Sequence, residues 1–207
     1  MAVLGLSDAE RAQVEAAVTA AEARTAARFA VVVAHASDDY APYPIMWAAA
    51  VALIVGDIVA LAWPGLSTLS IIGVQTVLFI VADPLLHLRP LRYRAVPQRV
   101  RKAHAHRLAA IEFAALVHDR AAGDVGLLLF ISEAERHVEI KADRGIDQHV
   151  DQAAWDKIVA DLGTGIGQGS VARALTDAIG ACADILAKHF PATADASPPG
   201  GPKLQEL

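Results

Sequence analysis

The sequence of 207 residues has little cysteine and no overall excess of positive charge. Its one cysteine, Cys182, excludes an internal disulfide and a CxxC-type zinc or redox motif. The net charge of -5 gives no basis for binding nucleic acid. Residues 1–17 lack the basic and apolar regions of a secretory signal peptide, so we expect no such peptide there.

Catalytic motifs are also missing. No nucleophile elbow, P-loop, zincin helix or aspartate-based phosphotransfer motif occurs. His104 and His106 are two positions apart in an expected helix, so they face different directions and cannot share a metal ion. His149 lies close to Asp147 and Asp151, where a surface ion pair is a simpler explanation than a catalytic base. The sequence therefore predicts no catalytic residue.

Apolar residues, in contrast, make up 55% of the chain and concentrate in two runs. Residues 45–63 carry a single charge, Asp57, and residues 66–82 carry none. A bilayer core needs about 17–25 residues of helix, so each run can span it. Only a Pro-Gly pair separates the runs, which predicts a tight turn. We therefore expect residues 43–88 to form a transmembrane helical hairpin; a buried hairpin of a soluble protein is the alternative.

Residues that flank these runs also fit a membrane. Trp47 and Trp63 lie near the ends of the first run, where tryptophan suits a membrane interface. Arg89, Arg92 and Arg94 follow the second run, whereas the connection between the runs has no charge. Basic residues stay on the cytoplasmic side, so we expect a two-pass inner-membrane protein whose termini and remaining domain are cytoplasmic. The expected partners are the lipid bilayer and an unidentified membrane protein.

Asp57 is the one charge inside the expected spans. A carboxylate at the centre of a bilayer costs about 2.5–3.5 kcal/mol, so it should have a partner or be protonated. If the hairpin folds at the Pro-Gly pair, Ser70, Gln75 and Thr76 lie within about one helical turn of it. We expect a hydrogen bond to one of them, and a homo-oligomer formed through the hairpin is the alternative.

The remaining segments predict one α/β domain that the hairpin interrupts. Residues 1–40 contain a helix with a capping box at Ser7 and Glu10, and then a buried strand. Residues 95–191 contain a second helix, two strands and two further helices. A helical crossover makes the first two strands parallel, and a four-residue turn makes the third antiparallel. The expected segments are a strand at 29–35, a helix from about 97 to 120, strands at 125–132 and 137–142, a helix at 151–162, a flexible connection at 163–169 and a closing amphipathic helix.

This order predicts a small mixed β-sheet sandwiched by helices, with the hairpin inserted in the crossover. Residues 192–207 contain turn-forming residues without apolar periodicity, so we expect a disordered tail.

Two groups of charges flank the expected strand at residues 137–142. Residues 133–136 form the turn before it, where solvated charges are ordinary. Asp143 and Asp147 follow the strand at the opposite end of the sheet. Gly145 between them permits a tight turn with positive φ that would bring both carboxylates together. Oxygen ligands suit Ca²⁺ or Mg²⁺, so this pair is the candidate metal site, and a polar turn before a helix is the alternative.

These motifs resemble the TPM domain family, also called the TLP18.3/Psb32/MOLO-1 domain. The resemblance covers about residues 6–40 and 97–191. It rests on LSDAERAQVEAAV, FAVVVAH, HVEI followed by Asp143-Arg144-Gly145-Ile146, AAWDKIV, GTGIGQG and ALTDAIGACADILAKHF.

The resemblance implies an α/β sandwich of membrane-tethered or exported proteins. Some relatives are described as calcium-binding or as weak acid phosphatases, and others as accessory factors of membrane complexes. The sequence departs from the family pattern because residues 1–6 contain no aspartate and because Asp147 stands where glutamate is usual. We therefore predict a membrane-anchored TPM-like domain acting as a non-catalytic interaction or accessory protein. The alternative is a weak phosphatase that depends on Ca²⁺ or Mg²⁺.

Overall fold

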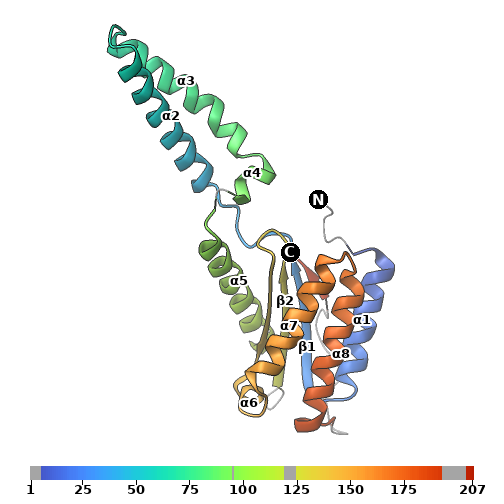
Figure 1. Cartoon of the computed structure of the whole chain (residues 1–207). Coiled ribbons are helices and arrows are strands. Elements are labelled where there is room, and N and C mark those ends of the chain that lie inside the picture. Colours follow the sequence, from blue (N-terminus) through green and yellow to red (C-terminus); the bar gives the residue numbers. More distant parts are fainter. Residues whose placement is uncertain (1–5, 95, 119–124, 193–203) are drawn as a thin grey trace. The chain divides into compact units, whose positions relative to one another are not determined.

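The computed structural model describes residues 6–94, 96–118, 125–192 and 204–207 (Figure 1). The chain separates into two compact units. The sheet unit comprises Met1–Ser37 and Ala103–Leu207, and the hairpin unit comprises Asp38–Lys102. The sheet unit is therefore assembled from two segments of the sequence on either side of the hairpin unit.

The sheet unit contains a four-stranded mixed sheet with the strand order β3-β2-β1-β4. β1 pairs in parallel with β2 and β4, whereas β2 and β3 are antiparallel. The predicted arrangement of the first three strands is thereby confirmed. The described elements of this unit are α1 (Asp8–Glu22), β1 (Ala27–Ala34), α5 (Gln98–His118, which begins in the hairpin unit), β2 (Val125–Ser132), β3 (His137–Ala142), α6 (Arg144–Asp147), α7 (Gln152–Gly167), α8 (Val171–His189) and β4 (Leu204–Glu206).

Helices cover both faces of the sheet, as the sequence predicts (Figure 1). Successive side chains of a strand point to opposite faces, so β1 and β2 supply two cores. Val31 and Leu129 belong to the larger core, with residues of α1, α7 and α8. Val32 and Phe130 belong to the smaller one, with Ala105 of α5. Both faces are apolar, which explains why β1 and β2 are nearly continuous apolar runs.

The capping box predicted for the first helix is present at the start of α1. Ser7 Oγ accepts the Glu10 N–H at 3.3 Å, and the Glu10 carboxylate accepts the Ser7 N–H at 2.9 Å. The Ser7 hydroxyl also donates to the Glu10 carboxylate at 2.6 Å, and this bond, with that from the Ser7 N–H, lowers the pKa of Glu10. At the other end of the chain, α8 buries Cys182 among its apolar residues, and burial raises the pKa of this thiol to about 12. Cys182 is therefore an inert core residue.

The structure departs from the prediction at the glycine-rich segment 163–169. α7 continues through Gly167 instead of ending at Leu162. Gly165 lies against α8, where an added Cβ would be only 2.6 Å from the Cβ of Ala174. Glycine is thus used here for close helix packing, and the chain turns only at Gly169, where φ is +80°.

The expectation of a disordered tail is wrong for its last part, because Leu204–Glu206 forms β4. The segment is too short to show an alternating pattern in the sequence, and β1 imposes the extended conformation by pairing with it. The expectation for residues 193–203 falls outside the part of the chain that the structure describes.

The hairpin unit contains α2 (Pro42–Ala62), α3 (Thr68–Leu86) and the short α4 (Arg89–Arg94). α2 and α3 pack against each other and are long and apolar enough, by length and composition, to cross a membrane. Their lengths of 21 and 19 residues fall within the range of about 17–25 residues for a membrane span. The predicted pair of apolar helices is therefore present.

Candidate functional site

The contact between α2 and α3 is built on small side chains. Its buried residues in α2 recur every fourth position: Pro44, Ala48, Ala52 and Gly56. Gly56 touches the side chain of Gln75, and an added Cβ would lie 2.2 Å from the Gln75 Cγ. Small residues at this spacing let two helices approach closely, which is typical of helix pairs in membranes.

Asp57 does not take part in this contact. It follows Gly56 and is therefore rotated by about 100° from the buried stripe, onto an exposed surface of α2. Thr76 Oγ1 donates instead to the backbone oxygen of Ile72 at 2.8 Å, and Ser70 Oγ lies 2.9 Å from Ser67 Oγ. The expected hydrogen bond from Asp57 to a side chain of α3 is not made within the described residues.

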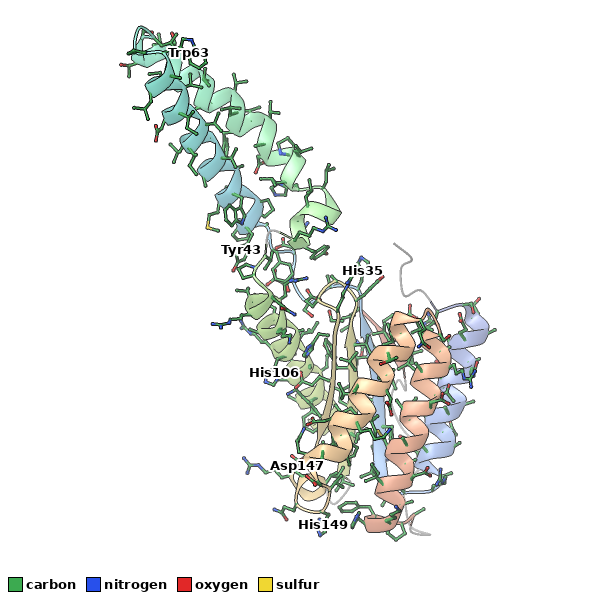
Figure 2. All side chains as sticks on the ribbon, in the orientation of Figure 1. His35, Tyr43, Trp63, His106, Asp147 and His149 are labelled. Atoms are coloured by element: carbon green, nitrogen blue, oxygen red, sulfur yellow. The ribbon has the colours of Figure 1, made fainter. Side chains whose placement is uncertain are left out.

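Trp47 and Trp63 lie at different ends of α2 and are 46% and 62% exposed. Trp63 adjoins the connection between the helices, and Tyr43 lies at the other end of α2 (Figure 2). The two indole rings thus lie at different levels along the helix, and their place at the membrane interfaces stays a prediction.

Basic and aromatic residues gather where the hairpin unit begins and ends. α4 carries Arg89, Arg92 and Arg94, and the Arg92 guanidinium lies 5.9 Å from the ring centroid of Tyr93. The Tyr93 ring in turn meets Tyr40 edge to face, with the centroids 6.0 Å apart. Arg92 therefore lies beside a pair of tyrosine rings, a combination that suits a lipid headgroup region.

The candidate metal ligands Asp143 and Asp147 lie at the two ends of α6. The Asp143 carboxylate accepts the Arg144 N–H at 2.7 Å and so caps this short helix. Gly145 is helical and lacks the positive φ that we expected, because the capped turn winds as a helix. Its backbone oxygen lies 2.9 Å from His149 Nδ1. The Asp143 carboxylate is therefore used by the helix itself, whereas Asp147 is exposed at the other end of α6.

Among the residues that the structure describes, no group of three or more His, Cys, Asp or Glu is arranged to hold a metal ion. No third residue of these types joins Asp143 and Asp147 in the described part of the chain, and the Ca²⁺ or Mg²⁺ site stays a prediction. Figure 2 shows Asp147 and His149 at one end of the sheet unit and His35 at the other, which agrees with the expected separation of the two charged groups.

The turn between β2 and β3 is less solvated than its sequence indicates. Glu135 is only 5% exposed, so the expectation of a solvated charge is wrong at this position. Its carboxylate accepts hydrogen bonds from the Ser37 N–H at 3.1 Å and from the Ser132 hydroxyl. Beside it, His35 Nδ1 lies 2.9 Å from Glu133 Oε2. These contacts fasten the chain that leaves β1 to the β2–β3 turn.

A second polar cluster, missed in the sequence, surrounds Glu139 of β3. Its carboxylate oxygens lie 2.8 Å from His106 Nδ1, 3.1 Å from His137 Nε2 and 3.0 Å from Lys141 Nζ. Burial acts to raise the pKa of Glu139, but hydrogen bonds from His137 and Lys141, with the charges of Lys141 and His106, lower it to about 2. The cluster thus favours the ionised form of this carboxylate, which links α5 to β3 through His106.

The sheet unit also has a cleft of about 410 Å³ between α7 and α8. Its polar lining includes Asp161, Gln168, Arg173 and Asp177, and the last two form an exposed ion pair at 3.8 Å. Asp161 pairs in turn with Lys157 at 2.5 Å, and Ser170 also lines the cleft.

A small mixed sheet with helices on both faces places the chain in the class of α/β sandwich domains. Within that class, residues 99–185 match the family model of the TPM domain. The predicted resemblance to the TPM domain family is confirmed.

The NMR structure of the BA42 protein from the psychrophilic bacterium Bizionia argentinensis has a similar fold. The TM-score is 0.60 at 16% sequence identity, and the alignment covers 98% of this chain and 95% of that chain. No curated protein matches the chain.

Proposed function

We propose that this chain is a membrane-anchored, non-catalytic interaction or accessory protein whose anchor is the hairpin of α2 and α3. One observation carries the proposal: the large apolar side chains of both helices point outward. Leu53, Leu61 and Leu69 are 56%, 84% and 79% exposed. A core helix of a soluble protein would bury such residues, whereas a lipid-facing helix exposes them.

The charges that flank the hairpin support a two-pass topology with the sheet unit in the cytoplasm. Residues 89–102 contain six Arg or Lys and no acidic residue, whereas residues 63–67 between the helices carry no charge. Positive charge resists translocation, so the connection between α2 and α3 would be outside and both flanks inside. In a bacterial cell, this is the inner membrane.

The exposed carboxylate of Asp57 favours an oligomer of hairpins. It finds no hydrogen-bond partner within the described hairpin unit, and exposure to lipid would cost about 2.5–3.5 kcal/mol. All copies cross the membrane in the same direction, so a second copy brings its own Asp57 to the same depth. Two carboxyl groups that share a proton there would satisfy each other.

Extraction of membranes with alkaline carbonate tests the anchor. The full chain should stay in the membrane fraction. The variant Ile54→Arg/Val77→Arg should be lost from it, because each arginine would cost about 2.5–3.5 kcal/mol at the bilayer centre. Both residues are exposed, at 60% and 61%, so the substitutions break no packing within the hairpin. Extraction of the unaltered chain would contradict the anchor.

The single cysteine makes the topology measurable. Cys182 is buried, so a membrane-impermeant maleimide should not label the unaltered chain. Ser67→Cys, in the connection, should be labelled in intact cells. Asp156→Cys, on the exposed side of α7, should be labelled only after lysis. Labelling of Asp156→Cys in intact cells would refute a cytoplasmic sheet unit.

The mass of the protein–detergent complex, measured by light scattering, tests the oligomer. Asp57→Leu should convert the oligomer to a monomer, and Asp57→Asn, which retains hydrogen bonding, should preserve part of it. An unchanged mass in both variants would show that Asp57 is not part of the interface.

The metal-dependent phosphatase remains the alternative to the non-catalytic role, and phosphate release from p-nitrophenyl phosphate that requires Ca²⁺ or Mg²⁺ would establish it.

A further inference from the structure

The edge of β1 that faces away from β2 is covered by two different parts of the chain. Near the start of β1, the side chain of Glu22 covers the edge, because its Oε1 accepts the Phe29 N–H at 3.1 Å. Near its end, β4 lies alongside, with Leu204 opposite Val31. A sheet edge presents N–H and C=O groups to any extended chain that fits beside it. The second half of this edge is therefore a position where a strand docks.

The main chain of residues 204–207 pairs with this edge as an added strand would. The Leu207 N–H donates to the Val33 oxygen at 3.0 Å, and the His35 N–H donates to the Leu207 oxygen at 2.7 Å. The strands are parallel over Val31–Val33. Hydrogen bonds of this kind are available to any sequence in extended conformation, so selectivity must come from side chains.

Two side chains of the docked segment meet matching groups of the sheet unit. Leu204 is 7% exposed and belongs to the larger core, together with Val14 of α1. Glu206 lies on the same face, and its carboxylate is 2.9 Å from Arg11 Nη2. Arg11 Nε is buried without a hydrogen-bond partner in the described structure, so the guanidinium can accommodate a second carboxylate oxygen. The edge thus selects an apolar residue two positions before an acidic one.

The segment that fills the position is short. β4 has three residues, whereas a typical strand has about 5–6. The sequence that precedes it, residues 198–202, consists only of proline and glycine. Within the described residues, the contacts of residues 204–207 hold this segment on the edge of β1.

We propose that the second half of the β1 edge is a docking site for an extended segment of a partner protein that carries an apolar residue two positions before an acidic one. Residues 204–207 occupy this site in cis and compete with the partner. The proposal rests on the proposed interaction function and names its surface. A competitor on the same chain acts at an effective concentration on the order of millimolar, so a partner must bind more tightly than residues 204–207 or pair along more of the edge.

Fluorescence polarisation of a labelled PKLQEL peptide with the full chain in detergent tests the site. The variant Leu204→Lys/Glu206→Arg releases the tail but leaves the edge intact. It should bind the peptide at least about tenfold more tightly than the unaltered chain, because the cis competitor is gone. Gln205→Ala is the matched control: its side chain points to the other face of the sheet, so it should bind like the unaltered chain.

A charge exchange tests the predicted selectivity. Removal of residues 204–207, combined with Arg11→Glu, should lose PKLQEL and gain a PKLQRL peptide. Peptide binding that is equal in all variants, or absent from the tail-released variant while its circular dichroism is unchanged, would overturn the docking site. So would a dimer that the Leu204→Lys/Glu206→Arg variant abolishes, because the edge would then serve a second copy. If the peptide does not bind to a chain that resists carbonate extraction, the docking site is wrong and the membrane anchor is retained.

Discussion

The charged cluster around Glu139 predicts a specific dependence of stability on pH. Its pKa is lowered from 4.5 to about 2 in the folded protein. The ionised carboxylate therefore stabilises the folded state above about pH 4.5, and this contribution is lost as the pH falls from about 5 to about 2. At 1.36 kcal/mol per pKa unit, the contribution is at most about 3 kcal/mol. The exposure of His106 and screening by solvent reduce it toward about 1–2 kcal/mol.

Glu139→Gln removes the charge and keeps the shape of the side chain. In detergent at pH 7, we expect its Tm to be lower than that of the unaltered chain by about 2–8 °C, from a shift of about 2–4 °C per kcal/mol. The difference should shrink by pH 3 and disappear near pH 2. Asp161→Asn, which removes an exposed i,i+4 ion pair with Lys157, should change the Tm little at any pH. An equal deficit for Glu139→Gln at pH 7 and pH 3 would refute the electrostatic account.

Three further predictions follow from the packing, the acidic residues and the thiol. Gly165→Val should lower the free energy of unfolding by about 1–3 kcal/mol in a thermal or denaturant scan, because the added side chain collides with α8, whereas Gly163→Ala, with open space around it, should be neutral or stabilising. Excess Ca²⁺ or Mg²⁺ should leave the Tm unchanged; a rise corresponding to about 2.7 kcal/mol at 100 times the dissociation constant, lost in Asp143→Ala/Asp147→Ala, would instead establish a metal site. Cys182 should react with maleimide only on unfolding, and rapid labelling of the folded chain at pH 7 would contradict its burial.

Where a signal lies within a single segment, sequence and structure agree. β2 spans Val125–Ser132 and β3 spans His137–Ala142, as their composition predicts. Ser7 and Glu10 form the expected capping box, and the two apolar runs are helices. Each of these features depends on side chains that are near one another in the sequence, so their spacing is sufficient to predict them.

The features that escaped prediction depend on residues that are distant in the sequence. Glu135 is buried because Ser37 supplies a backbone N–H from 98 positions away. Glu139 has His137 and Lys141 beside it on its own strand, but its third partner, His106, is brought to it by α5 from 33 positions away. Leu204 enters a strand because the β1 edge is available beside it. The expectation for Gly145 failed for another reason: a capped helical turn competed with a left-handed turn, and the short sequence does not distinguish them.

The insertion of the hairpin between β1 and β2 also determines when the protein can fold. His35 and Glu133, at matching ends of these strands, are 98 positions apart. At about 5–20 residues per second, the ribosome needs roughly 5–20 s to make the second strand after the first. During that interval, β1 has neither of its parallel neighbours, and the two apolar helices are synthesised before β2. The nascent chain therefore most needs a chaperone between the synthesis of β1 and the synthesis of β2. The sheet can form only after the hairpin has left the ribosome.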